Sequence, residues 1–125
     1  MFLGESGEMY LEAILVLSQK EMPVRSLDVA KFLGVSKPSV SRAMGILKSE
    51  NYINIDSQGY ITLTGKGESI AKKIYEKRVV FKEFIMYLGV DEETAARDAC
   101  KIEHVLSDQT FEAIKEFKEK MVDLK

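Results

Sequence analysis

The stretch over residues 30–42 constrains the fold most strongly, because its pattern predicts two short helices joined by a tight turn. We predict a helix over residues 27–33, with Ser26 as its N-cap. Gly34 follows this helix at a position that favours a residue able to adopt positive φ. Ser36 then provides the N-cap of the next helix. The turn between the two helices is therefore marked by local signals on both sides.

The helix after this turn is predicted to have an apolar side and a polar side. Pro38 lies in its first turn, where the missing N–H costs no hydrogen bond. The apolar positions recur at helical spacing and are expected to face the core; they are Val40, Ala43, Met44 and Leu47. The outward positions near its N-terminal end are Lys37, Ser39, Ser41 and Arg42. This arrangement is typical of a helix-turn-helix motif, although other helical hairpins share it.

Two strand-like runs after this motif indicate a winged helix. They cover residues 52–56 and 60–64, and residues 57–59 form a turn between them. Short runs of β-branched and aromatic residues joined by a glycine-containing turn predict a β-hairpin. We therefore expect a winged helix-turn-helix domain over residues 1–66.

Helices are predicted for most of the remaining chain. The first should cover residues 5–19, and a long one, capped by Thr64, should cover residues 66–88. Two more should follow, over residues 92–106 with Asp91 as the cap and after Ser107. The fold class is thus mainly α with a small β-hairpin wing. Four aromatic residues of the C-terminal helices exceed what one small core needs, and they predict a symmetric homodimer through residues 67–125; they are Phe81, Phe84, Phe111 and Phe117.

The charge distribution favours DNA binding locally rather than globally. The chain has 18 basic and 20 acidic residues, a net charge of −2, yet residues 31–49 contain four basic residues and no acid. A small basic face matters more for DNA than the total charge. We predict contacts with bases or phosphates from Ser36, Lys37, Ser39, Arg42, Lys48, Ser57 and Gln58. The alternative for each lysine is an ordinary solvated charge.

A cluster of three potential metal ligands lies within residues 99–105. Cys100, Glu103 and His104 are spaced i, i+3 and i+4, so on a helix they would share one face. They include the only cysteine and the only histidine of the chain. A thiolate, a carboxylate and an imidazole suit a borderline divalent ion such as Fe²⁺, Co²⁺, Ni²⁺ or Zn²⁺. The alternative is a buried cysteine and a hydrogen-bonded core histidine.

Residues 7–13 and 98–108, taken together, resemble the diphtheria toxin repressor family of metal-dependent transcriptional regulators. The resemblance implies a winged helix that binds double-stranded operator DNA, expected to be palindromic, and a helical domain that dimerises. Many members carry a further SH3-like domain. The sequence ends at Lys125, so we expect a short form without that domain.

The resemblance also implies a set of metal ligands. Iron-sensing members bind the regulatory metal with residues that match Met9, Cys100, Glu103 and His104. Manganese-sensing members use carboxylates at the first two positions and a glutamate that matches Glu12. The softer sulfur ligands favour Fe²⁺ as corepressor over Mn²⁺, and Glu12 is a candidate fifth ligand.

The second, ancillary metal site of the family is not expected here. Its positions match Arg78, Lys82 and Ala96, none of which can ligate a divalent ion. We therefore predict about one ion per protomer. Arg78 is expected to replace the lost cation by pairing with a carboxylate, for which Glu83 and Glu103 are candidates.

Cys100 also allows functions other than metal-dependent regulation. An enzyme with Cys100 as nucleophile is disfavoured, because no glycine-rich oxyanion loop accompanies it. A metal-independent regulator and a thiol-redox sensor that uses Cys100 remain as alternatives. No apolar run approaches the roughly 18 residues of a membrane span, and no secretory signal is evident. A single cysteine cannot form an internal disulfide, which favours a reducing cytoplasm.

Overall fold

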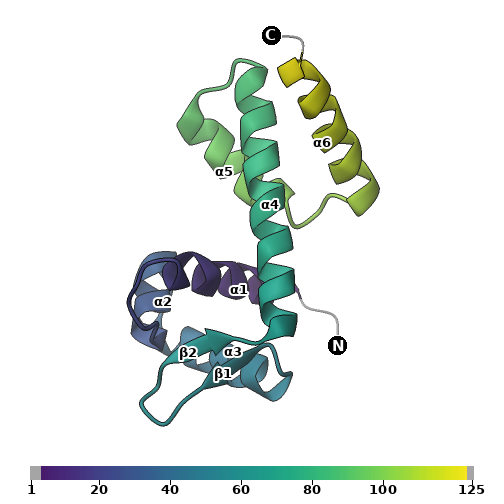
Figure 1. The fold of residues 1–125 in the computed structure, drawn as a ribbon. Coiled ribbons are helices and arrows are strands. Elements are labelled where there is room, and N and C mark those ends of the chain that lie inside the picture. The colour runs from purple at the N-terminus through teal and green to yellow at the C-terminus, as the bar shows by residue number, and fades with distance from the viewer. Residues whose placement is uncertain (1–3, 124–125) are drawn as a thin grey trace. The chain divides into compact units, whose positions relative to one another are not determined.

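The computed structural model describes residues 4–123 and divides the chain into two compact units, Met1–Lys72 and Lys73–Lys125. Residues 1–3 and 124–125, the ends of the two predicted domains, lie outside the described residues. The architecture is mainly helical with a two-stranded antiparallel hairpin, which confirms the predicted fold class (Figure 1).

The first unit contains the winged helix. In chain order its elements are α1 (Glu5–Ser18), α2 (Ser26–Leu33), α3 (Lys37–Ser49), β1 (Ile53–Ile55), β2 (Ile61–Leu63) and the start of α4 (Gly65–Tyr87). The predicted N-cap of α2 is wrong by one residue, because the N-cap is Arg25. The backbone N–H of Arg25 donates to Oδ2 of Asp28 at 2.9 Å, which satisfies the cap without Ser26.

The core of this unit draws on helices and wing alike. Leu11 and Ile14 of α1 are fully buried, and Ile53 and Ile61 of the two strands join them. The apolar side predicted for α3 is confirmed, with Val40, Met44 and Leu47 buried and Ala43 packed against them. Ile53 pairs with Leu63 and Ile55 with Ile61 in the hairpin. The wing is therefore fixed to the helices by its own apolar residues.

The start of α4 is fixed by a close backbone approach. Thr64 accepts a hydrogen bond from the N–H of Gly67 at 3.1 Å through Oγ1, which confirms it as the cap. The same hydroxyl donates to the carbonyl oxygen of Asn51 at 2.8 Å. A Cβ at Gly67 would overlap the carbonyl oxygen of Tyr52. Only glycine can therefore occupy this position without a local shift of the backbone.

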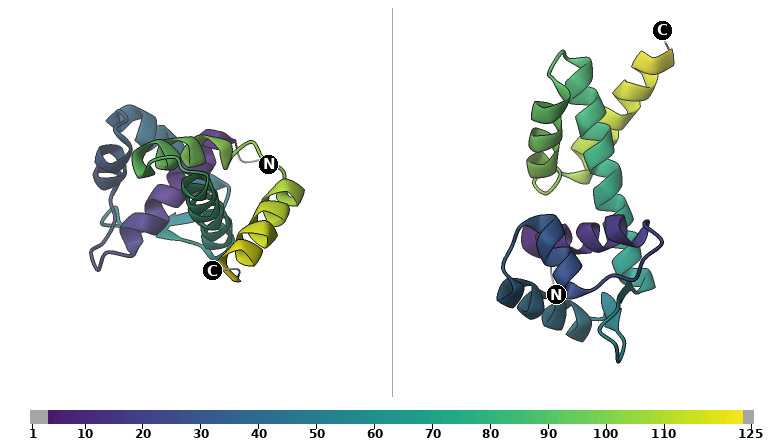
Figure 2. Two further views of the ribbon diagram at one scale, coloured as in Figure 1. Left: turned by 90° about the horizontal axis from the view of Figure 1, so that it is seen from above. Right: turned by 90° about the vertical axis from the view of Figure 1, so that its left-hand side faces the viewer.

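The second unit contains the rest of α4, α5 (Glu92–Ile102) and α6 (Asp108–Asp123). Both shorter helices run beside α4 (Figure 2). Asp91 and Ser107 cap them as predicted, each accepting a backbone N–H three residues later. Phe81 and Phe111 are buried in the small core and meet edge to face at a centroid distance of 5.7 Å. These two rings are therefore buried within the unit. The prediction that they exceed what its core needs is wrong for Phe81 and Phe111.

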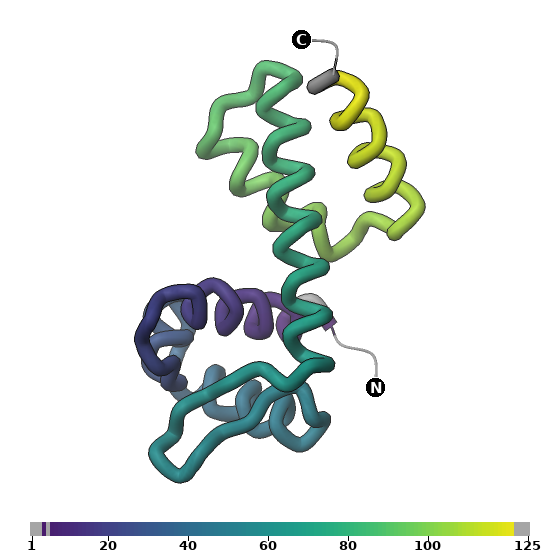
Figure 3. Tube along the Cα trace, viewed as in Figure 1, coloured from purple at the N-terminus to yellow at the C-terminus, as the bar shows by residue number. Residues whose placement is uncertain are grey.

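The helix α5 ends at Ile102, so the predicted helix over residues 92–106 is four residues too long. Glu103 still donates its N–H to Ala99, but a turn follows, in which Val105 donates to the carbonyl of Ile102 at 3.1 Å. Ser107, five residues after the end of α5, then caps α6. Figure 3 traces the backbone through this turn.

Candidate metal centre and nucleic-acid interface

The helix-turn-helix presents a polar surface on α3. Gly34 ends α2 with φ of 68°, as predicted. Oγ of Ser36 accepts the N–H of Ser39 at 3.3 Å and donates to its hydroxyl at 2.8 Å. These bonds fix the first turn of α3, and the residues predicted to contact DNA are exposed on α3 and the wing; they are Ser36, Lys37, Ser39, Arg42, Lys48, Ser57 and Gln58.

The wing turn is organised by Asp56. Its Oδ1 accepts the backbone N–H groups of Gln58 and Tyr60, each at 2.9 Å. Gly59 has φ of 84°, which a non-glycine residue rarely adopts. The exposed Gln58 side chain is therefore held at a turn of defined shape.

A further cation, Arg25, was missed in the sequence. Its guanidinium lies 4.5 Å from the ring centroid of Tyr60, at the base of the wing. A side-chain hydrogen bond with Tyr60 raises the pKa of Arg25 above its ordinary value. The residue precedes α2 but reaches the wing because Val24 bridges to Ile61. No local signal predicts that contact, since it depends on pairing across the fold.

The potential metal ligands of the second unit lie at the end of α5. Cys100 is on the last turn, whereas Glu103 is the C-cap and His104 lies in the turn that follows. Their spacing predicted that all three would lie on one face of a continuous helix, but the helix ends before Glu103 and His104. The turn determines where the carboxylate and the imidazole lie.

Arg78 of α4 contacts two of these residues. Nη2 of Arg78 donates to Sγ of Cys100 at 3.9 Å, and Nε lies 3.6 Å from Oε2 of Glu103. The other oxygen of Glu103, Oε1, lies 3.3 Å from Nε2 of His104. This confirms Glu103 as the carboxylate partner expected for Arg78. The other candidate, Glu83, pairs with Lys118 instead.

The donor types suit a divalent metal, although the side chains do not converge on one point. Within residues 4–123, no three side chains of His, Cys, Asp or Glu converge as a metal shell requires. Sulfur, carboxylate and imidazole donors nevertheless lie within one set of contacts, and the side chains of Glu103 and His104 are 0% and 4% exposed. Sulfur, carboxylate and imidazole are donor types that a borderline divalent ion prefers.

The two other predicted ligands belong to the first unit. Met9 and Glu12 lie three residues apart on α1, and hence on one side of that helix. Met9 is half-buried and Glu12 is buried. Their participation in a metal shell stays a prediction.

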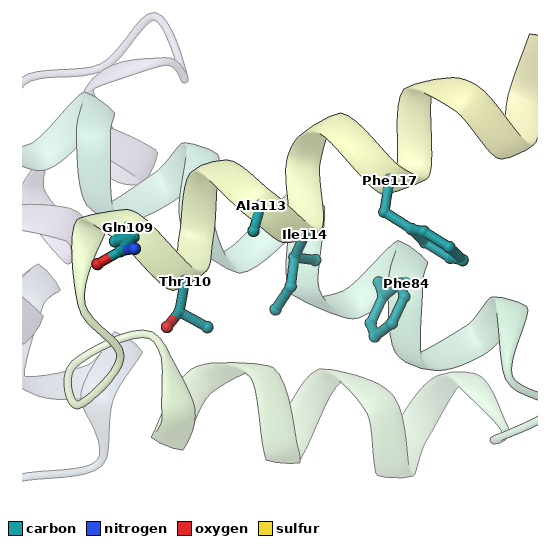
Figure 4. A pocket seen from close by; sticks show the side chains of 6 residues that line it. All are labelled: Phe84, Gln109, Thr110, Ala113, Ile114 and Phe117. Carbon is teal, nitrogen blue, oxygen red and sulfur yellow. The ribbon is translucent and has the colours of Figure 1, made fainter.

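An apolar groove lies between α4 and α6 in the second unit. Figure 4 shows its lining, which consists of Phe84, Gln109, Thr110, Ala113, Ile114 and Phe117. Phe84 and Phe117 meet edge to face at 6.0 Å, yet Phe117 remains 49% exposed. In contrast to Phe81 and Phe111, this pair leaves apolar surface uncovered.

Comparison with known proteins identifies the family. A model of the N-terminal DNA binding domain of the iron dependent repressor matches residues 2–66. A model of its metal binding and dimerisation domain matches residues 64–122. The chain belongs to the iron-dependent repressor family. This repressor is accordingly a metal-responsive DNA-binding regulator of transcription, and the resemblance noted in the sequence is confirmed.

Related regulators support the assignment. An HTH-type transcriptional regulator of Methanocaldococcus jannaschii, described as uncharacterized, is 39% identical over 123 residues, which are 97% of this chain and 98% of that protein. The transcriptional regulator MntR of Escherichia coli is 33% identical over 111 residues, 89% of this chain and 72% of its own.

A solved structure shares the fold. The manganese regulator SloR matches with a TM-score of 0.82 and 28% identity, over 95% of this chain and 55% of that one. The repressor therefore spans about half the length of that structure. Among the helices of residues 4–123, none is both long and apolar enough to cross a membrane.

Proposed function

We propose that this repressor uses Fe²⁺ as corepressor and holds it with Cys100, Glu103 and His104 of the helical domain. The observation that carries the proposal is that these three donors share one set of contacts at the end of α5. Bound there, the ion would supply a positive charge that the cysteine sulfur, the carboxylate and the imidazole could all coordinate. The cysteine sulfur favours Fe²⁺ over Mn²⁺, although relatives include a manganese regulator.

We propose that the shell is completed from α1. Met9 and Glu12 are the candidates, by resemblance to the iron-sensing and manganese-sensing members respectively. Arg78, Lys82 and Ala96 offer no ligands for a second site, so the proposal is one ion per protomer. We also propose that residues 1–66 form the DNA-binding domain and residues 67–125 the metal-binding and dimerisation domain.

The proposed consequence of metal binding is a shift in population. Side chains from two domains can hold one ion only in arrangements that bring those side chains together, so binding favours such arrangements. In a homodimer, such an arrangement would set two α3 helices about one DNA turn apart, roughly 34 Å. A palindromic operator would match the two-fold symmetry of the dimer.

For the dimer contact we propose the apolar groove between α4 and α6. Its supporting observation is the exposed ring of Phe117 beside Phe84. Exposed apolar patches on a small unit are commonly buried by association. Sedimentation at micromolar concentration should therefore report a dimer, and a monomer would contradict this part of the proposal.

The decisive experiment measures DNA binding by metal-stripped protein under strictly reducing conditions. The DNA is an operator selected from random sequence with metal-loaded protein, and Fe²⁺, Mn²⁺, Zn²⁺ or no metal is added. We expect metal-dependent binding, strongest with Fe²⁺, that is lost in Cys100→Ala and His104→Ala and weakened less in Met9→Ala. Binding that ignores the metal would support the metal-independent alternative. A Cys100→Ala variant that still responds fully would overturn the ligand assignment.

The same assay tests the DNA surface. Arg42→Ala should weaken operator binding by about 1–3 kcal/mol if this arginine contacts a base. Lys20→Ala removes an equal charge from an exposed position outside α3 and the wing, and it serves as the control. Equal effects of both substitutions would remove Arg42 from the base-contacting face.

Metal content per chain tests the stoichiometry. After dialysis against a modest excess of Fe²⁺ or Co²⁺, we expect one tightly held ion, which Cys100→Ala should lose. Two tightly held ions, or one ion that survives the loss of Cys100, would contradict the proposal.

A further inference from the structure

Arg78 contacts two of the proposed ligands at once. Its Nη2 lies 3.9 Å from Sγ of Cys100 and its Nε lies 3.6 Å from Oε2 of Glu103. The remaining carboxylate oxygen faces His104 at 3.3 Å. A fixed positive charge therefore adjoins the same sulfur and the same carboxylate that a metal ion would need.

An arginine in this place competes with a metal ion. Protein ligands bind first-row divalent ions at about 2.0–2.3 Å, so the sulfur and the carboxylate must turn their lone pairs toward the ion. Lone pairs that face the guanidinium are not available for this. Arginine stays protonated in proteins, so it cannot give way by losing its charge. It must move aside, and any close approach of the two cations is opposed by Coulomb repulsion.

Exposure indicates which partner can move. The side chain of Arg78 is 31% exposed, whereas that of Glu103 is 0% exposed. Water can therefore receive the guanidinium when it leaves, but the carboxylate is held in the protein. The distance of 3.6 Å between Nε of Arg78 and Oε2 of Glu103 is also longer than an ordinary N–H···O hydrogen bond of about 2.9 Å.

We propose that Arg78 is a tethered cation that occupies the metal-binding end of the helical unit in the metal-free repressor, and that its displacement sets the metal concentration at which the repressor responds. The inference rests on the proposed metal site. It adds a residue that binds no metal but tunes the affinity of those that do. Replacing Arg78 by a neutral residue should therefore make the repressor respond at lower metal concentration.

The test is a titration of metal-stripped protein with Co²⁺, followed by the sulfur-to-cobalt absorption band. Arg78→Gln leaves a shorter, uncharged polar side chain and should lower the Kd for Co²⁺ by about tenfold or more, the equivalent of about 1.4 kcal/mol. Lys82→Gln is the matched control. It removes one positive charge from the next turn of α4, where Lys82 pairs with Glu92 at 3.1 Å. Its Kd should stay at the wild-type value.

Thermal unfolding provides a second readout that needs no DNA. Without metal, Arg78→Gln should lower the unfolding midpoint because Cys100 and Glu103 lose a neighbouring cation. With Co²⁺ in excess, the midpoint should rise more in the variant than in wild type, since tighter binding stabilises the folded state more. Arg78→Lys keeps the charge but cannot contact Cys100 and Glu103 with two separate N–H groups of a planar guanidinium. Its Kd for Co²⁺ should therefore lie between those of wild type and Arg78→Gln.

The possible results distinguish failure of the inference about Arg78 from failure of the proposed metal site. An Arg78→Gln variant with unchanged or weaker Co²⁺ binding overturns the inference, and so does an equal gain in Lys82→Gln. If Arg78→Gln does not fold, an unchanged Kd in Arg78→Lys overturns it. Wild-type protein that binds no Co²⁺, or Cys100→Ala that binds it equally well, would instead overturn the proposed metal site and the inference with it.

Discussion

The winged-helix unit and the helical unit are stabilised by different kinds of contact. The first buries apolar side chains from α1, α2, α3 and both strands in one continuous core. Among the described residues, the core cluster of the second is smaller and is built on Val80, Phe81, Ala99 and Phe111. Ion pairs join its helices instead; among them are Lys73 and Lys77 with Asp108, Lys82 with Glu92, and Lys115 with Glu76.

This difference has an energetic consequence. Burial of a large apolar side chain stabilises a fold by roughly 1.5–3 kcal/mol, whereas an exposed ion pair contributes about 0–1 kcal/mol. We therefore expect the helical unit to have less stability of its own than the winged helix. A bound ion or a second protomer, which stabilise the folded state by mass action, should matter more to the helical unit.

The largest expected effect comes from emptying the smaller core. Phe81→Ala should destabilise the helical unit by about 3–5 kcal/mol, because it removes a ring that is 1% exposed and packs on Phe111. Met44→Ala makes a comparable cavity in the winged helix. Hydrogen exchange resolved along the chain should show Phe81→Ala releasing protection after residue 73 while protection before it persists. Uniform loss of protection in both variants would refute the independence of the two cores.

A smaller effect is expected where the winged helix meets α4. Gly67→Ala should destabilise by about 1–3 kcal/mol, because the new Cβ overlaps the carbonyl oxygen of Tyr52. Gly45→Ala is the control, since that helical glycine has open space around it and its replacement should stabilise by about 0.5–1 kcal/mol. Urea unfolding measures both. Opposite signs are expected, and a stabilising Gly67→Ala would show that the close approach is not retained.

The smallest effect concerns the ion pairs. Hydrogen bonds from Lys73 and Lys77 hold the pKa of Asp108 below its ordinary value of 3.8. A carboxyl group with a lowered folded-state pKa adds stability above its unfolded pKa, and that stability is lost as the pH falls through the folded value. The helical unit should therefore weaken in acid, and Asp108→Asn should weaken less over the same pH range. An identical acid dependence in the variant would show that the ion pairs of Asp108 do not contribute to the loss of stability in acid.

Much of the fold followed from the sequence because its signals are local. The caps at Ser36, Thr64, Asp91 and Ser107 each involve a hydrogen bond that spans three residues, so residue type and spacing were sufficient to predict them. Gly34 was predictable for a similar reason, since positive φ is a property of one residue. The potential ligands of the second unit were likewise visible as residue types close together in the chain.

Tertiary structure decided the features that join distant segments. Arg78 had two plausible carboxylate partners in the sequence, and packing of α4 on the end of α5 selected Glu103 across 25 residues of chain. The same packing buried Phe81 and Phe111 in the core of the helical unit but left Phe117 exposed. Helical spacing alone extended α5 through Glu103 and His104, whereas the turn into α6 ended it at Ile102. The sequence thus determined which donors are available, and the fold decided that a cation already adjoins them.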